Sequence, residues 1–169
     1  MATSAIRELQ MACLPVAIGS AAAIFSNLVI MKKVGEVRYT DKSVEVHPYK
    51  PWTDKSPQAD AHFRAFKAST NCTEWTGYFI PLLWLYALYL PAIASLGLPS
   101  LLATVLHWSP ALLGIGFASC NLKYVDGYIQ SAKGRIPGFT RRLNCFLFTF
   151  AGLVIGVAVV GARSAGLLA

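Results

Sequence analysis

Four stretches of the 169-residue chain contain no aspartate, glutamate, lysine or arginine. They run from 11 to 31, from 75 to 98, from 101 to 122 and from 143 to 162. Each is about 20 residues long or slightly longer, which is the length that a helix needs to cross the hydrocarbon core of a bilayer. A helix also satisfies its own backbone hydrogen bonds, as lipid requires. The pattern therefore predicts an all-α membrane protein with a bundle of four transmembrane helices.

The positive charge of the chain is concentrated in two segments. The net charge is +7, and eight of the 15 lysines and arginines lie between 32 and 67, with five more between 123 and 142. These segments connect spans 1 and 2 and spans 3 and 4, so the positive-inside rule places both connections in the cytosol. The charge is thus explained by topology and by attraction to membrane lipids. It gives no reason to expect nucleic-acid binding.

The remaining sequence signals set approximate element bounds. We expect a single domain over residues 1–169, with spans at about 9–33, 58–97, 101–133 and 140–166, and cytosolic segments at 34–57 and 134–139. Ser56 followed by Pro57 predicts the start of the second helix, and "RIPGF" (135–139) predicts a turn into the fourth. The first uncharged run exceeds a typical signal-peptide core, so we expect it to remain as a span. The four cysteines lack metal or C-x-x-C spacing, so neither a disulfide nor a metal site is expected.

Two sets of polar residues recur at helical spacing near the cytosolic ends of their helices. In the second helix the residues are spaced 3, 4, 3 and 4 apart, which keeps them within an arc of about 80° on one face. This set, here called the helix-2 stripe, consists of Arg64, Lys67, Asn71, Glu74 and Tyr78. In the third helix the spacing is 4, 3 and 4, within about 60°; its members are Tyr124, Tyr128, Ser131 and Arg135.

Simpler roles are open for many of these residues. Basic residues near span ends often extend to lipid headgroups, and this is the interpretation for Lys32, Lys33, Lys123, Arg141 and Arg142. A carboxylate such as Glu74 is costly at the start of a span unless it is paired. Glu74 either pairs with Lys67 or Arg64 or binds a ligand. An extended tripeptide with two carboxylates and an ammonium, such as glutathione, matches the second alternative.

Two longer motifs contain these stripes. "FRAFKASTNCTEWTGYFIPLLW" (63–84) resembles the second-helix signature of the MAPEG family, the membrane-associated proteins in eicosanoid and glutathione metabolism. "KYVDGYIQSAKGRIPGF" (123–139) resembles the third-helix signature of the same family. Within it, the motifs are most similar to the branch of microsomal glutathione transferase 2 and leukotriene C4 synthase. Motif order and four-span topology extend the resemblance over essentially the whole chain.

The resemblance implies a left-handed four-helix bundle assembled as a homotrimer, with glutathione bound between protomers near the cytosolic face. It implies that Arg135 is the catalytic residue that stabilises the glutathione thiolate. The glutathione-binding residues that it implies are Lys33, Lys67, Ser69, Asn71, Glu74, Tyr124 and Tyr128. The implied activity is conjugation of glutathione, as co-substrate, to lipophilic electrophiles, together with peroxidase activity toward lipid hydroperoxides. The implied location is the endoplasmic reticulum membrane, with a mitochondrial membrane as the alternative.

Three positions depart from the family pattern. Lys67 stands where the family usually has arginine, Ser69 where it has glutamine, and Trp75 where it has tyrosine or phenylalanine. Lysine offers a point charge in place of a bidentate guanidinium, so it should bind a carboxylate more weakly. These departures leave open a non-catalytic alternative, a lipid-binding partner or an accessory subunit of a larger membrane complex. The absence of charges at mid-depth in the spans argues against an ion channel or transporter.

Overall fold

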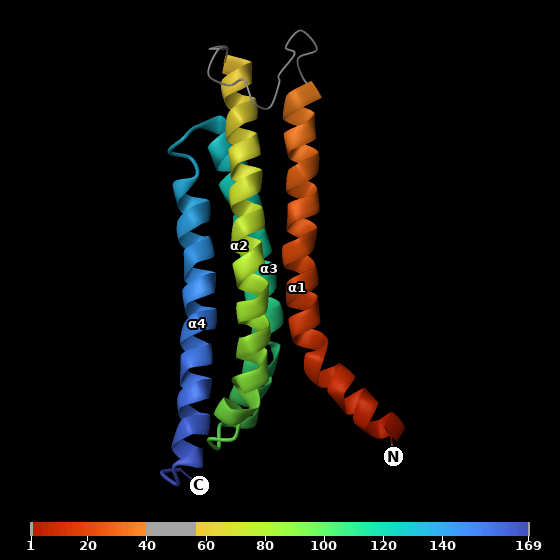
Figure 1. Cartoon of the computed structure of the whole chain (residues 1–169), viewed down its shortest axis with the longest axis vertical. Helices are drawn as coiled ribbons and strands as arrows, with labels where there is room; N and C mark the ends of the chain where they lie inside the picture. Colours follow the sequence, from red (N-terminus) through yellow and green to blue (C-terminus); the bar gives the residue numbers. More distant parts are fainter. Residues whose placement is uncertain (1, 40–56, 169) are drawn as a thin grey trace.

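Four long helices make up the structure, which is a computed structural model (Figure 1). They are α1 (Ala2–Tyr39), α2 (Pro57–Ala94), α3 (Ser100–Gln130) and α4 (Ile136–Ser164). The structure describes the backbone of residues 2–39 and 57–168, and side chains from 4 to 37 and from 60 to 168; within these ranges it contains no strand. All four helices are long and apolar enough to cross a membrane. The prediction of an all-helical membrane protein with four spans is therefore confirmed at this level.

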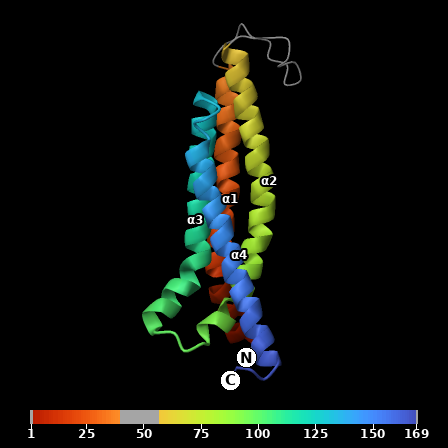
Figure 2. The same ribbon diagram turned by 90° about the vertical axis from the view of Figure 1, so that its left-hand side faces the viewer.

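The helices lie side by side and alternate in direction (Figures 1 and 2). The last turn of α1, the first turn of α2 and the α3–α4 turn lie at one end, here called the loop end; both termini and the α2–α3 turn lie at the other, the terminal end. Helices α2 and α3 contact each other and both of the remaining helices, whereas the described parts of α1 and α4 do not touch. The two basic connections therefore share one end, as the charge pattern predicts.

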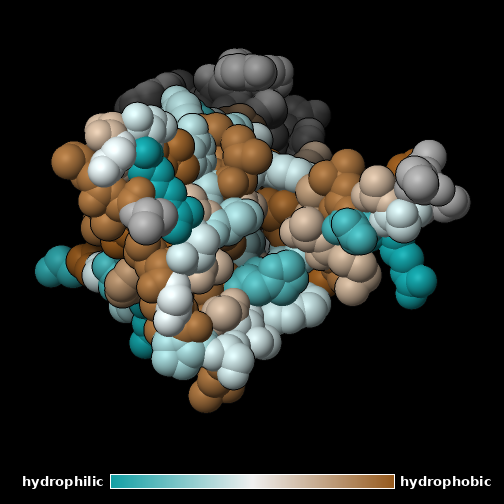
Figure 3. Space-filling view, turned by 90° about the horizontal axis from the view of Figure 1, so that it is seen from below, coloured by the Kyte–Doolittle hydropathy of each residue, from teal (hydrophilic) through white to brown (hydrophobic). Residues whose placement is uncertain are grey.

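Prolines distort the bundle at the terminal end. Helix α1 contains Pro15, and its N-terminal part bends away from the other helices (Figure 1), so that it stands out as a separate arm in the end view (Figure 3). Sharp helix bends usually occur at proline, because it removes a backbone donor and crowds the preceding turn. Together with Pro91 of α2 and Pro110 of α3, Pro15 lines an apolar pocket of about 270 Å³. The pocket thus lies beside the bend of α1.

The observed bounds differ from those predicted at several helix ends; α1 begins at Ala2 rather than 9, and α2 ends at Ala94 rather than 97. Helix α1 continues to Tyr39, so the connection begins later than the predicted position 34; a Lys32–Glu36 ion pair one helical turn apart supports this extension. Helix α3 ends at Gln130, before the predicted Lys133, and α4 begins at Ile136, before the predicted 140. Helix α2 begins at Pro57, as expected, but Ser56, its predicted cap, lies outside the described residues.

The early end of α3 has a local cause. Ser131 adopts an extended backbone, and its hydroxyl accepts a hydrogen bond from the Gly134 amide at 3.0 Å. Serine hydroxyls compete with helical hydrogen bonding in this way. The turn then packs on α3 so closely that a Cβ on Gly127 would lie 2.1 Å from the Gly134 carbonyl oxygen. The motif "RIPGF" is therefore not a turn: Arg135 caps α4, and the other four residues form its first turn.

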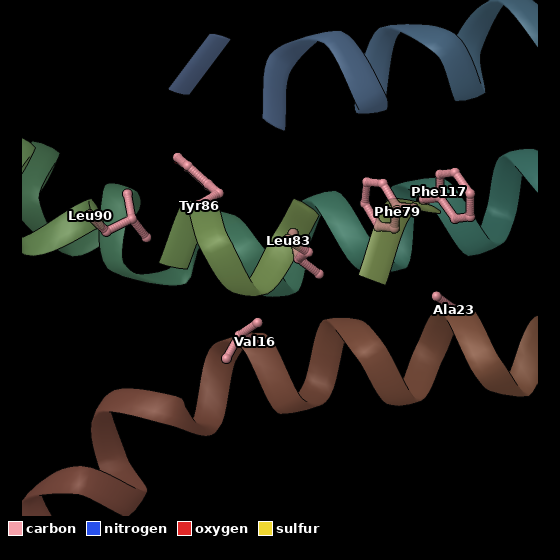
Figure 4. Packing of buried hydrophobic residues seen from close by; sticks show 7 residues of the cluster. All are labelled: Val16, Ala23, Phe79, Leu83, Tyr86, Leu90 and Phe117. Carbon is pink, nitrogen blue, oxygen red and sulfur yellow. The ribbon is translucent and has the colours of Figure 1, made fainter. Parts of the chain in front are cut away.

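The centre and the terminal half of the bundle have an apolar core. Buried positions of α2 follow helical spacing; they include Cys72, Thr76, Phe79, Leu83, Tyr86 and Leu90. The last four of these pack with Val16 and Ala23 of α1 and with Phe117 of α3 (Figure 4). The Phe79 and Phe117 rings stack with centroids 4.0 Å apart. Helices α1 and α3 meet through glycine, since a Cβ on Gly114 would lie 2.2 Å from the Gly19 Cα.

Candidate functional site

A pocket of about 380 Å³ opens near the loop end, where α2, α3 and α4 converge. It is lined by Asn71, Tyr124, Arg135, Ile136 and Phe139. All five lie within the two motifs that were singled out in the sequence, and three of them, Asn71, Tyr124 and Arg135, belong to the two polar sets. The pocket therefore brings together residues from both predicted polar sets. Arg135 and Asn71 both line it without having to touch each other.

Arg135 reaches the predicted tyrosines by a different route from the one expected. The helical spacing placed Arg135 on α3 with Tyr124 and Tyr128, and this is wrong because α3 ends at Gln130. Arg135 instead caps α4, and its guanidinium carbon lies 5.0 Å from the Tyr128 ring centroid. The two tyrosine rings are 5.9 Å apart. An exposed guanidinium over a ring is weakly attracted to it, so the turn, rather than the helix, holds this cation at the pocket.

Glycine 138 lets α4 approach α3 at the pocket. A Cβ at this position would lie 2.4 Å from the Tyr124 amide nitrogen, which real side chains do not allow. Tyr124 is consequently covered and only 4% exposed. The close approach also brings the next turn of α4, with Arg142, into the interior of the bundle.

Arg142 is fully buried, with 0% of its surface exposed. The prediction that it extends to lipid headgroups is therefore wrong, whereas Lys32, Lys123 and Arg141 are exposed. The guanidinium carbon of Arg142 lies 4.5 Å from the ring centroid of Tyr124, 4.8 Å from that of Trp75 and 5.5 Å from that of Phe139. Aromatic faces attract a desolvated cation. Arg142 lies in the second turn of α4, so its burial adds a charge to the bundle interior near the loop end without placing one at mid-depth.

Hydrogen bonds link Arg142 directly to α2 and α3 and, through side chains of those helices, to α1. Its Nη2 donates to the Asn71 side-chain oxygen at 2.8 Å, and its Nη1 donates to the Asn121 side-chain oxygen at 3.2 Å. The Asn121 amide reaches the Thr76 hydroxyl at 3.5 Å, which in turn lies 3.4 Å from the Asn27 oxygen on α1. We call these five residues the Arg142 network. Networks of this kind hold helices in one relative arrangement when their polar groups are satisfied.

The helix-2 stripe divides between two environments. Arg64 and Asn71 turn partly inward, whereas Lys67, Glu74 and Tyr78 are exposed, Tyr78 to 69%. Ser69 is half-buried. Lys67, Ser69 and Glu74 do not line the pocket, and no ion pair between described residues involves Lys67 or Glu74. Only Asn71 of the stripe therefore belongs to the pocket within one chain.

Two other predicted cations have partners inside the bundle. Arg64 pairs with Asp60 and donates to the Ile129 carbonyl oxygen at 3.0 and 3.2 Å. That carbonyl belongs to the last turn of α3, where cations are favourable. Lys33, predicted to bind glutathione, is 2.5 Å from a carboxylate oxygen of Asp126 on α3 and does not line the pocket. Both contacts join helices to each other.

The sequence of α4 contained a pattern that indicates the burial of Arg142, separate from the spacings in the second and third helices. The buried residues at the start and middle of α4 are Gly138, Arg142, Thr149 and Gly156. Their spacing of 4, 7 and 7 confines them to about 40° of one face. Small and polar residues on a single face are typical of helix interfaces in membranes. Asn121 and Thr76 were also visible as isolated polar residues in uncharged runs.

No protein-family model matches the chain, and no curated protein matches it. The resemblance to the MAPEG family therefore depends on the two motifs and on the positions of their residues. In the described part of the chain, no three residues among histidine, cysteine, aspartate and glutamate are grouped to hold a metal ion.

Proposed function

We propose that this protein is a membrane-bound glutathione transferase that ionises the glutathione thiol for attack on lipophilic electrophiles. The observation that supports this most is the pocket of about 380 Å³ in which Arg135 lies with Tyr124 and Asn71. Its volume is within the range of about 300–1,000 Å³ that is common for small-molecule sites. A cation, a phenol and an amide in one such space suit an anionic, polar ligand.

Arg135 supplies the activating charge in this proposal. A free thiol has a pKa of about 8.5, so only a small fraction is thiolate at neutral pH. A guanidinium beside the sulfur favours the thiolate, which is the nucleophile. Attack on an epoxide forms a C–S bond and breaks a C–O bond, and the resulting alkoxide takes a proton from water; attack on an activated alkene forms a C–S bond and breaks the C=C π bond, and the adjacent carbon takes a proton from water. Attack on a hydroperoxide transfers the distal oxygen to sulfur and releases the lipid alcohol; a second glutathione then converts the sulfenic acid to the disulfide and water.

A single chain provides only part of the glutathione-binding set in this proposal. Lys67 and Glu74 are exposed on the outer side of α2 and do not line the pocket. We propose that they act on glutathione bound against a neighbouring copy, in the homotrimer of left-handed bundles that the family resemblance implies. Lipophilic acceptors would enter from the surrounding bilayer. The proposed location is the endoplasmic reticulum membrane.

One observation favours the second candidate, a non-catalytic lipid-binding partner or accessory subunit. Trp75, where the family has tyrosine or phenylalanine, packs at right angles against Phe139 and Phe146. Its ring also lies over Arg142. The substituted residue thus contributes to packing inside the chain, and it has no hydroxyl to offer a ligand.

The test uses the purified protein in detergent with glutathione and a generic aryl halide. We expect wild type to bind glutathione, produce an ultraviolet thiolate signal and form the conjugate. We expect Arg135→Ala to reduce the thiolate fraction at least about tenfold, equivalent to one pKa unit or more, with a much smaller loss of affinity. Lys133→Ala, an exposed cation in the same turn, is the matched control. Absence of binding and turnover in wild type would reject the enzyme; an unchanged thiolate signal in Arg135→Ala would reject the role of Arg135.

A further inference from the structure

Arg142 carries a buried charge that the proposed chemistry does not use. It is the largest fully buried side chain of the described residues, and no carboxylate among them pairs with it. A buried ion is costly, and replacing it with an apolar residue of similar volume is often neutral or stabilising. A purely structural role is therefore a weak reason for a cation at this position.

The contacts of Arg142 determine how Asn71 is oriented. A guanidinium has donors only, so the Asn71 atom at 2.8 Å from Nη2 is the side-chain oxygen. With its oxygen held toward Arg142, Asn71 has both amide N–H groups free to turn toward the pocket that it lines. The Arg142 Nη1 donates to Asn121 and to the Cys72 sulfur at 3.5 Å, while its Nε has no acceptor among the described residues.

The charge of Arg142 lies directly behind the pocket wall. Tyr124 and Phe139 line the pocket, and the same two rings cover the Arg142 guanidinium. Only a layer of aromatic and amide groups therefore separates the cation from the pocket. A buried charge attracts an anion on the other side of such a layer strongly, because the dielectric constant between them is low. Salt screens a buried charge less than an exposed one.

We propose that Arg142 is a positioning residue that makes the pocket select a carboxylate group: it holds Asn71 with its N–H donors toward the ligand and provides the positive charge behind them. This inference rests on the proposed function and specifies what part of glutathione the inner pocket recognises. Arg135 and Arg142 then have separate tasks, since Arg135 acts on the thiol at the pocket mouth and Arg142 acts through Asn71.

The experiment compares glutathione with glutathione diethyl ester, whose carboxylates are neutralised, by calorimetric titration of the full chain in detergent. We expect wild type to bind glutathione about tenfold more tightly than the diester, in line with hydrogen bonds to a charged group. We expect Arg142→Met to lose this preference, through weaker glutathione binding and nearly unchanged diester binding. Arg142→Lys, which retains the positive charge but lacks the several donors of a guanidinium, should recover part of the preference for glutathione. Arg141→Met, which removes the neighbouring exposed arginine, should retain the wild-type preference.

A second variant keeps the proposal testable if Arg142→Met does not fold. Asn71→Asp retains an oxygen for Arg142 and removes the N–H donors, so it should fold and lose the preference for glutathione. If either Arg142→Met or Asn71→Asp still preferred glutathione over the diester as strongly as wild type does, the proposal would be overturned. Equal weakening of both ligands in Arg142→Met would overturn it too, because that result indicates a structural role. If wild type binds neither ligand, the proposed function fails and this inference fails with it.

Discussion

The loop-end and terminal-end halves of the bundle are both closely packed, but different contacts hold them. Toward the loop end, Arg142 and Asn121 are fully buried and joined by directed hydrogen bonds. Toward the terminal end, residues such as Leu83 and Leu90 pack by shape alone, and Gly114 lets α3 touch α1. In a bilayer, lipid tails are as apolar as leucine, so helices associate through close packing and polar contacts. Polar contacts predominate toward the loop end and close packing predominates toward the terminal end, where the Tyr86–Ser109 and Trp84–Ser20 hydrogen bonds add to it.

The difference suggests why a site lies at only one end. A polar network fixes the relative positions of side chains from several helices, as a binding site requires. In the terminal half, the pocket near Pro15, Pro91 and Pro110 is lined by no polar side chain from α1 or α2. We therefore expect substitutions in the terminal half to change stability, and substitutions in the Arg142 network to change stability and ligand binding together.

Gly114→Val should have the largest effect. Its side chain would overlap the backbone of Gly19, so α1 must move away from α3. Overpacking typically costs about 1–3 kcal/mol, and we expect at least the upper value because backbone atoms cannot rotate aside. Equilibrium unfolding in mixed micelles measures this. Gly116→Val is the matched control, since a Cβ there meets only the Cys145 sulfur, at 3.5 Å. Equal losses for both variants would show that close α1–α3 contact does not hold the terminal half.

Asn121→Leu tests the other half and should have an intermediate effect. It removes an acceptor from Arg142, and a buried donor left unsatisfied costs about 1–3 kcal/mol. We expect a loss near 2 kcal/mol in the same unfolding measurement, together with weaker glutathione binding. Asn144→Leu, at an exposed position of α4, should change neither quantity. A stability loss without a binding change would separate the network from the site.

Leu83→Ala should have the smallest effect of the three. Leu83 is fully buried among α1, α2 and α3, and leucine-to-alanine changes in cores cost about 2–5 kcal/mol. We expect a value near or below the lower limit, because the unfolded reference in a membrane mimic is already apolar and only packing is lost. Leu85→Ala, at a 48% exposed position of the same helix, should be nearly neutral. Any change in glutathione affinity in Leu83→Ala would contradict the proposed independence of the two halves.

Much of the fold was predictable from the sequence, and the candidate site was predictable only in part. Uncharged runs identified four helices, because crossing a bilayer sets a minimum length. Helical spacing placed Tyr124 and Tyr128 together, which the structure confirms. The same spacing failed for Arg135, because the Ser131–Gly134 hydrogen bond ends α3 first. The termination depends on a few local hydrogen bonds and a glycine contact, which spacing does not reveal.

The sequence by itself determined the number of helices, their minimum lengths and the common end of the helices that flank both basic connections, because the requirements of a bilayer act on each segment separately. Only the tertiary structure decided which polar residues face one another. Arg141 and Arg142 are adjacent in sequence and chemically identical, yet one is exposed and the other is fully buried. Their difference comes from the approach of α4 to α3 at Gly138, which turns one side of α4 toward α2 and α3. Burial of a charge depends on that shared environment, and no single segment contains it.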